Sequence, residues 1–244
     1  MGTERARNKR RNARRRERYR LDRLLELERS LWSNGLSLIA GVDEVGRGPL
    51  AGPVVAAAVI LPSDCGGIDS VRDSKQLSAQ ARATLAVEIR ERALCWGVGA
   101  ASVREIEHRN ILRASHLAMR RALARLRPEP EHIVIDGLPV PELGQRQTAV
   151  VDGDAKVHCV ACASILAKVV RDGLMERLAV RHPGYGWERN AGYATSEHRE
   201  AILRLGPSPH HRLSFTSLQY ALEFGDPDEA EPPIAVPIDP GATP

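Results

Sequence analysis

Apolar residues recur along the chain in two patterns, one typical of buried strands and the other of amphipathic helices. Five short apolar runs bounded by glycine, proline or polar residues predict strands, at 36–39, 54–61, 93–101, 132–136 and 148–151. Helical spacing predicts helices at 19–32, 78–91, 103–127 (in two pieces), 155–181, 196–205 and 216–223. Strands that first follow one another and then alternate with helices favour an α/β or α+β domain with a mixed sheet.

The composition is that of an ordinary globular protein. The 244 residues are 43% hydrophobic and 27% charged, and this length is enough for one large domain with a real core. No apolar run approaches the roughly 20 residues that span a bilayer, and no apolar segment follows the basic N-terminus as in a secretory signal. We therefore expect a cytoplasmic protein that has no membrane partner and acts as a monomer.

Four cysteines are present, and the two that are closely spaced form Cys159-x-x-Cys162 in a run of small residues. No second CxxC pair completes a zinc site. At helical spacing among alanines, the pair is interpreted as small apolar packing rather than as a redox or metal site.

Charge is concentrated at the two ends of the chain. Residues 1–20 contain ten arginines and lysines against two glutamates, whereas residues 225–244 contain five acids and no base. We expect the first segment to be a disordered arm that binds polyanions and the last to be a disordered acidic tail, with the folded domain over 21–224. The alternative for the arm is that it only aids solubility.

Carboxylates follow three of the predicted strands, each beside a glycine. They are Asp43-Glu44, followed by Gly46-Arg47-Gly48, then Asp136-Gly137 and Gly153-Asp154. An isolated Asp-Glu pair would more often be a polar turn, but neighbouring strands bring their ends together, and four converging anions would repel one another without cations. Oxygen ligands in this number suit Mg²⁺ or Mn²⁺, and paired ions of this kind serve phosphodiester hydrolysis. The residues therefore indicate metal-assisted phosphoryl transfer without naming a substrate.

The chain resembles bacterial ribonuclease HII from about Leu36 to Phe215. The resemblance rests on these motifs: Gly41-Val42-Asp43-Glu44-Val45-Gly46-Arg47-Gly48-Pro49, Asp73-Ser74-Lys75, Ile135-Asp136-Gly137, Gly153-Asp154, Ala163-Ser164-Ile165-Leu166-Ala167-Lys168-Val169, Gly192-Tyr193-x-Thr195-x-x-His198 and His211-Arg212-x-Ser214-Phe215. It implies a ribonuclease H-like fold, with a central mixed five-stranded sheet flanked by helices and a C-terminal helical part at about 182–224. It also implies Mg²⁺- or Mn²⁺-dependent cleavage of RNA in RNA–DNA hybrids and of single ribonucleotides embedded in duplex DNA, leaving 3′-hydroxyl and 5′-phosphate ends.

The resemblance also implies roles for individual residues. Asp43, Glu44, Asp136 and Asp154 fall on the metal-binding catalytic acids, and Gly46, Arg47 and Gly48 on a loop that senses the ribose 2′-hydroxyl. Tyr193 falls on a tyrosine that packs against the neighbouring sugar, and Lys75 on a phosphate contact. Asp172 is either a residue that supports the metal ligands or one half of a surface ion pair. Family members often carry lysine at the positions of Asp152 and Ala191, so this chain has less positive charge beside the expected nucleic-acid groove.

Three other interpretations are weaker. Ribonuclease HIII shares the acids but usually lacks the Gly-Arg-Gly loop and carries an additional N-terminal domain. A non-catalytic nucleic-acid-binding module would be favoured by a missing carboxylate, and all four are present. A dinucleotide-binding unit would need a G-x-G-x-x-G turn between a strand and a helix, which the sequence lacks.

Overall fold

A single mixed sheet of five strands organises the chain. The structure is a computed structural model that describes residues 2–71, 74–144, 146–215 and 218–219, and their side chains other than those of 2–10, 13 and 14. The strands are β1 (Ile39–Val45), β2 (Val54–Ile60), β3 (Cys95–Ala101), β4 (His132–Asp136) and β5 (Gln147–Val150). Their order in the sheet is β3-β2-β1-β4-β5, with β1 antiparallel to β2, β2 antiparallel to β3, and β1, β4 and β5 parallel. The predicted strands are confirmed, except that β1 starts later and continues through the two acids.

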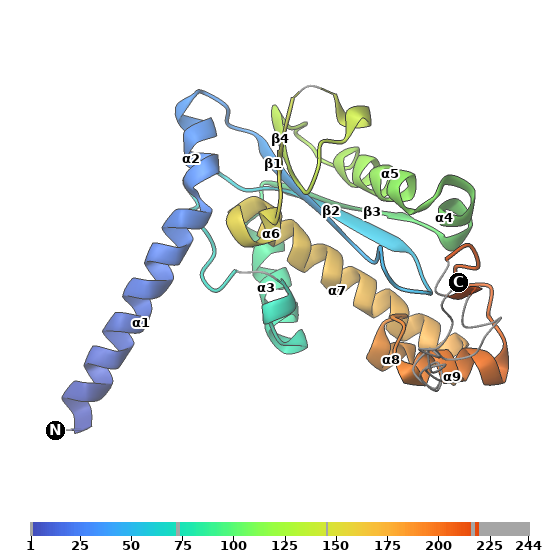
Figure 1. Cartoon of the computed structure of the whole chain (residues 1–244). Coiled ribbons are helices and arrows are strands. Elements are labelled where there is room, and N and C mark those ends of the chain that lie inside the picture. Colours follow the sequence, from blue (N-terminus) through green and yellow to red (C-terminus); the bar gives the residue numbers. More distant parts are fainter. Residues whose placement is uncertain (1, 72–73, 145, 216–217, 220–244) are drawn as a thin grey trace, which may run out of the picture.

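Helices cover both faces of this sheet (Figure 1). On one face α5 (Ile111–Leu123) packs on β1, β2 and β3, and α4 (Val103–Arg109) precedes it. On the other face α7 (His158–Arg181) packs on β1 and β2, and α3 (Ala79–Arg92) packs on α7. A Cβ atom on Gly41 would lie 2.2 Å from the backbone of Cys159, so the absence of a side chain is what lets α7 approach β1 this closely.

Short elements join and extend these layers. The segment η1 (Ser74–Gln76) precedes α3, η2 (Pro141–Leu143) lies in the β4–β5 loop, and α6 (Gly153–Lys156) precedes α7. The C-terminal part contains α8 (Trp187–Asn190) and α9 (Ser196–Leu205), and it packs at the C-terminal end of α7. The expected helix at 216–223 and the acidic tail at 225–244 lie largely or wholly outside the described residues. Cys159 and Cys162 are buried and unbridged in α7, as the packing interpretation predicted.

The N-terminal segment differs from the expectation of a disordered arm. Residues Gly2–Leu24 form the helix α1, followed by α2 (Glu26–Ser33). Arginine, lysine, alanine and glutamate all have high helix propensity, so a charged segment can extend a helix that is already started. The start is provided by Leu21, Leu24 and Leu25, which are buried against the domain. Among the helices that the structure describes, none is long and apolar enough to cross a bilayer.

A buried glutamate joins α2 to the N-terminus of α7. Val157, which precedes α7, provides no side-chain cap. Glu28 provides the missing cap, because its carboxyl group accepts the backbone N–H groups of His158 at 3.3 Å and Cys159 at 2.9 Å. His158 is also buried, and its Nε2 accepts the N–H of Ile68 at 2.9 Å. Glu28 therefore caps the main sheet-covering helix from a distant part of the chain.

This cap should make stability depend on pH. Burial raises the pKa of Glu28 from 4.5 to about 7. Between these values the folded chain keeps a proton that the unfolded chain has lost, so the free energy of unfolding falls as pH rises, by on the order of 3 kcal/mol in total. Glu28→Gln has no such proton, so wild type should lose this stability relative to the variant between pH 4.5 and 7. Urea unfolding across that range measures it, with the exposed Glu26→Gln as a control, and parallel curves for wild type and Glu28→Gln would contradict it.

Candidate active site

The carboxyl ends of β1, β4 and β5 meet at one edge of the sheet because these three neighbouring strands are parallel. Asp43 and Glu44 lie near the end of β1, and Asp136 is the last residue of β4. The chain leaves β5 and turns at Asp152 into α6, whose first turn contains Asp154. The structure therefore brings together the four acids that the sequence analysis singled out.

Asp43 points toward the α7 face of the sheet and is buried. Its Oδ1 accepts the backbone N–H of Glu44 at 2.7 Å, and Ser164 of α7 forms a side-chain hydrogen bond with it. Ser164 in turn lies 3.0 Å from the Ser74 hydroxyl. Burial, together with the charges of the other three acids, raises the pKa of Asp43 well above its usual range. A cation beside Asp43 would offset both causes of this shift.

Glu44, the next residue, points to the opposite face, as alternation along a strand requires. Its Oε1 lies 3.2 Å from the guanidinium of Arg47, while its buried Oε2 has no hydrogen-bond partner among the described residues. Burial raises the pKa of Glu44, and the charge of Arg47 opposes that rise. Glu44, Arg47 and Asp136 line a groove of about 410 Å³ together with His116 of α5 and residues of the β4–β5 loop.

Asp136 is bound to the start of α6, the short helix that contains Asp154. The Oδ1 of Asp136 accepts the N–H of Gly153 at 2.6 Å, which fixes α6 against the end of β4. Asp152 makes the turn from β5 into α6 possible by adopting a left-handed conformation with φ of 56°. Lys75 extends from η1 with its side chain 82% exposed, and its Nζ lies 3.6 Å from Oδ2 of Asp154. The predicted phosphate-contact lysine therefore lies directly beside one of the acids.

The four acids fit a hard divalent cation by their donor chemistry. All four offer carboxylate oxygens, and the buried unpaired Oε2 of Glu44 is a group that a ligand would satisfy. Within the described residues, however, no three His, Cys, Asp or Glu side chains already surround a common point as a coordination shell. Several of their oxygens are instead held by backbone N–H groups and by Arg47 and Lys75. Coordination would therefore require side-chain rotations within a backbone arrangement that already places the acids together.

Two buried arginines hold the loop that follows β1. Arg212 donates to the carbonyl oxygens of Gly46 at 2.6 Å, Arg47 at 2.9 Å and Gly52 at 3.0 Å. Arg171 of α7 donates to the carbonyl oxygens of three further residues, Ala51, Pro53 and Ala191. Gly46 has φ of 93°, and a Cβ atom there would lie 2.1 Å from Arg171, so glycine is required. The Gly46-Arg47-Gly48 loop is thus positioned through its backbone.

Tyr193 lies in the turn beside this loop, 42% exposed, with Lys168 and Arg171 each 6.0 Å from its ring centroid. A buried network orients the turn. Trp187 donates to Nε2 of His198 at 2.9 Å, so the proton of His198 is on Nδ1, which donates to the carbonyl oxygen of Tyr193 at 2.8 Å. His211 completes the network by donating from Nε2 to His198 at 3.1 Å, and burial lowers the pKa of His211 to about 4, which keeps it neutral.

Some predicted residues lie elsewhere or were missed. Asp172 accepts from Lys168 at 2.7 Å and lies 3.8 Å from Arg82, so its ion-pair partners among the described residues belong to α7 and α3. Asp73 lies outside the described residues. The role of the buried Arg171 was not expected from the sequence, although Arg171 lies in a stripe of buried residues on α7 with Ala167 and Met175. A charged residue at a core position of a helix is a signal that could have identified it.

Known proteins match the part of the chain that contains the sheet and the four acids. The sequence profile of the family Ribonuclease HII matches residues 40–218. The ribonuclease HII of Synechococcus sp. (strain JA-3-3Ab) is 56% identical over 197 residues, which cover 80% of this chain and 89% of that protein. The ribonuclease H2 from Pyrococcus horikoshii OT3 superposes with a TM-score of 0.64 at 26% identity, covering 76% of this chain and 97% of that one.

A further solved structure, of Bst-RNase HIII in complex with Mn²⁺, has a TM-score of 0.58 at 24% identity and covers 78% of this chain and 70% of that one. At this identity the likeness shows a shared fold alone. Together with the sheet order described above, these structures confirm the expected ribonuclease H-like fold.

Proposed function

The chain belongs to the ribonuclease HII family of ribonuclease H enzymes, and on that premise we propose that it hydrolyses the RNA strand of RNA–DNA hybrids and single ribonucleotides embedded in duplex DNA. The observation that carries the proposal is the meeting of Asp43, Glu44, Asp136 and Asp154 at the shared edge of β1, β4 and β5. We place this activity in the cytoplasm, and we keep the expectation of a monomer.

We propose that these four acids hold Mg²⁺ or Mn²⁺. The chemistry that a pair of such ions supplies is activation of a water molecule and stabilisation of charge on the leaving oxygen. The residues of the chain prepare the site for this chemistry. Asp43 and Glu44 approach it from opposite faces of β1, and the hydrogen bond from Gly153 fixes Asp136 beside α6. Lys75 and Arg47 hold positive charge beside Asp154 and Glu44, where a substrate phosphate would replace the carboxylates as their partner. We propose that the bond between the phosphorus and the 3′ oxygen is the one broken, which leaves 3′-hydroxyl and 5′-phosphate ends.

Selection of a ribonucleotide is assigned to the Gly46-Arg47-Gly48 loop and Tyr193. The 2′-hydroxyl is the group that distinguishes the two sugars, and backbone groups of a rigid loop can read it without a long side chain. The carbonyl contacts of Arg212 and Arg171 support this role because they fix the backbone of the loop. The hydrogen bond from Leu50 to Gly192 at 2.8 Å ties the loop to the Tyr193 turn, so both contacts are held as one unit.

The direct test is incubation with a DNA duplex that contains one ribonucleotide, beside an all-DNA duplex of the same sequence, in Mg²⁺, Mn²⁺ or EDTA. We expect one cut at the ribonucleotide in either metal and none in EDTA or in the all-DNA duplex. An RNA–DNA hybrid in the same series compares the two substrate classes. Cutting of the all-DNA duplex at the same rate would contradict the assigned selectivity.

Replacing Tyr193 separates recognition from binding. Tyr193→Ala removes a ring that would pack on the sugar, a contact comparable to base stacking worth about 1–3 kcal/mol, so cleavage at a single ribonucleotide should slow by about tenfold or more. Affinity for the duplex should change much less because phosphate contacts dominate it. Tyr193→Phe keeps the ring and should retain most activity. Equal losses of binding and cleavage in Tyr193→Ala would show a plain contact instead.

A further inference from the structure

A basic groove lies where α1 meets the active-site side of the domain. It encloses about 560 Å³ and is lined by Tyr19, Arg20, Arg23, Leu24 and Glu26 of the N-terminal helices and by Ala155 and Lys156 of α6. The lining contains three cations and one anion together with the largely exposed ring of Tyr19. Two of the cations pair with acids outside the lining, Arg20 with Glu17 at 2.5 Å and Lys156 with Asp152 at 3.5 Å, so a phosphate would exchange with these carboxylates. Ala155 and Lys156 of this lining belong to α6, the same short helix that contains Asp154. Phosphate groups beside a planar ring are the chemistry that such a lining complements.

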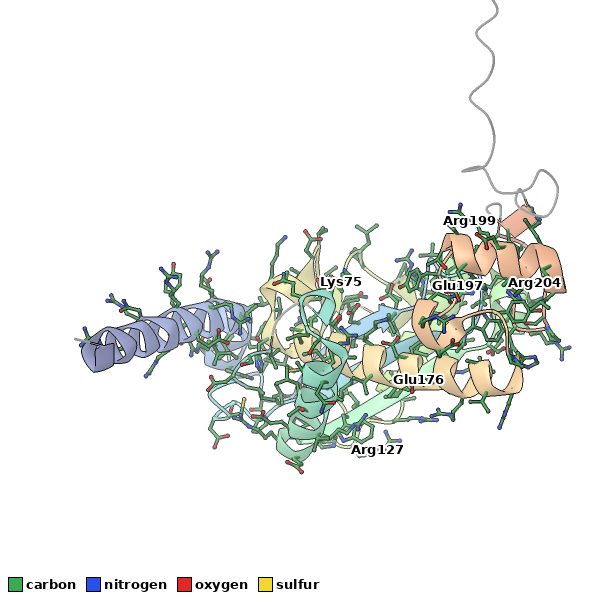
Figure 2. All side chains as sticks on the ribbon, turned by 90° about the horizontal axis from the view of Figure 1, so that it is seen from below. Lys75, Arg127, Glu176, Glu197, Arg199 and Arg204 are labelled. Carbon is green, nitrogen blue, oxygen red and sulfur yellow. The ribbon has the colours of Figure 1, made fainter. Side chains whose placement is uncertain are left out.

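The positive charge of the groove continues along α1. Arg16, Arg20 and Arg23 are spaced four and three residues apart and therefore share one face of the helix. Arg11, Arg15 and Arg18 are also exposed, and their spacing places them toward the opposite side of the helix, so positive charge surrounds α1. Figure 2 shows α1 projecting away from the rest of the chain, so these side chains are accessible. At 23 residues the helix is about 35 Å long, close to the rise of about ten base pairs of duplex.

The root of α1 is fixed to both segments that lead into the site. Arg20 donates to the carbonyl oxygen of Val71 at 2.5 Å, and Glu17 accepts the N–H of Ser70 at 2.9 Å. The loop that contains these two residues leads to Lys75. Leu21 fills the space over Gly67 in the same loop, and α1 also packs on α6, which contains Asp154. The helix therefore has a defined direction relative to the acids.

We propose that the groove between α1 and α6, together with the arginine face of α1, binds the phosphate backbone of the substrate duplex on one side of the cleavage position. This rests on the proposed function, since it is the active site that sets the position of the duplex. Because α1 leaves the domain in one direction, the additional contacts reach about one helical turn of duplex on that side and not on the other. The arginines of α1 would thus bind the same duplex that the acids cleave.

The test compares duplexes that differ only in the side on which they are extended. A short duplex with a central ribonucleotide and six base pairs on either side is lengthened by twelve base pairs, on one side or on the other. Affinity is measured in EDTA by fluorescence anisotropy from 0.05 to 0.3 M salt. Wild type should bind one of the two extended duplexes on the order of tenfold more tightly than the other at 0.1 M salt.

The double variant Arg16→Ala/Arg23→Ala should lose this preference, and its log–log salt slope on the favoured duplex should flatten by about 2. A matched control, Arg104→Ala/Arg204→Ala, removes equal charge from α4 and α9 at the other end of the molecule and should keep the preference (Figure 1). Both variants should still cut the short duplex at the ribonucleotide, and their urea unfolding curves should match that of wild type, which shows that they fold.

Equal affinity of wild type for the two extended duplexes would overturn the inference, as would an unchanged salt slope in Arg16→Ala/Arg23→Ala. In that case α1 would serve another acidic partner, such as a protein segment. Cleavage of the short duplex separates this result from failure of the proposed function. If wild type cleaves that duplex but shows no side preference, the inference about α1 fails alone. If wild type does not cleave it, the proposed function fails.

Discussion

Asp43→Asn and Asp136→Asn are each expected to reduce cleavage in Mg²⁺ by a factor of about 10³ or more. Each change removes an anionic oxygen from the set of acids that would hold the metal, at almost no change in volume. Steady-state cleavage of the single-ribonucleotide duplex measures the loss. Near-wild-type turnover of both variants in Mg²⁺ would refute the assignment of the carboxylates.

Asp43→Asn should have the opposite effect on stability. Burial and three neighbouring acids raise the pKa of Asp43, so above its usual pKa of 3.8 the folded chain is penalised for ionising it, and the penalty is complete at high pH. Asp43→Asn removes that penalty, and without metal at pH 8 it should unfold at a higher temperature than wild type. Added Mg²⁺ should stabilise wild type and stabilise the variant much less.

Asp152→Asn is the matched control for both measurements. Asp152 lies two residues from Asp154, but its side chain is exposed and pairs with Lys156 at 3.5 Å. Asparagine also tolerates the left-handed conformation of this position. Its cleavage rate and its response to Mg²⁺ should therefore stay close to those of wild type.

Arg212→Ala is expected to be the most destabilising single change considered for this chain, by about 3–5 kcal/mol. The side chain is fully buried and supplies hydrogen bonds to three carbonyl groups, which would be left without a donor in a cavity. Burial lowers the pKa of Arg212 to about 9, so the guanidinium still carries its charge at neutral pH. Urea unfolding at pH 7 measures the effect.

Arg212→Lys keeps the charge but cannot reproduce the planar fork that reaches separate carbonyl groups. We expect it to fold with intermediate stability and to discriminate poorly between ribonucleotide-containing and plain DNA duplexes. Arg47→Ala, in contrast, removes an exposed side chain from the loop that Arg212 holds. If the loop acts through its backbone, Arg47→Ala should keep discrimination. If Arg47→Ala lost discrimination and Arg212→Lys kept it fully, the Arg47 side chain and not the backbone of the loop would recognise the ribonucleotide.

The sequence predicted what depends on local pattern. The apolar runs identified the strands because each is short and bounded by glycine, proline or polar residues. The helix predicted from residue 78 is α3, which Ser78 caps by accepting the N–H of Ala81 with its side chain. The acids could be grouped because parallel strands share an edge. The hydrogen bonds of Arg212 and Glu28 could not be predicted in this way, since their partners lie 160 and 130 residues away along the chain.

The structure differs from the sequence-based expectation in two helices. The charge of residues 1–20 predicts a disordered arm, whereas a helix needs only one anchored end to extend through residues of high propensity. The single helix expected at 155–181 is divided at Val157 into α6 and α7. The division places Asp154 in a short helix of its own, where its charge acts on Asp43, and helical periodicity contains no information on such a turn.

The cap that Glu28 provides has a consequence for synthesis of the protein. Glu28 is 130 residues ahead of His158, so at about 5–20 residues per second the ribosome produces α2 roughly 7–26 seconds before the helix end that Glu28 caps exists. During that interval the carboxylate remains hydrated, and α2 has no final position to occupy. The first helices made are therefore among the last to reach their final positions.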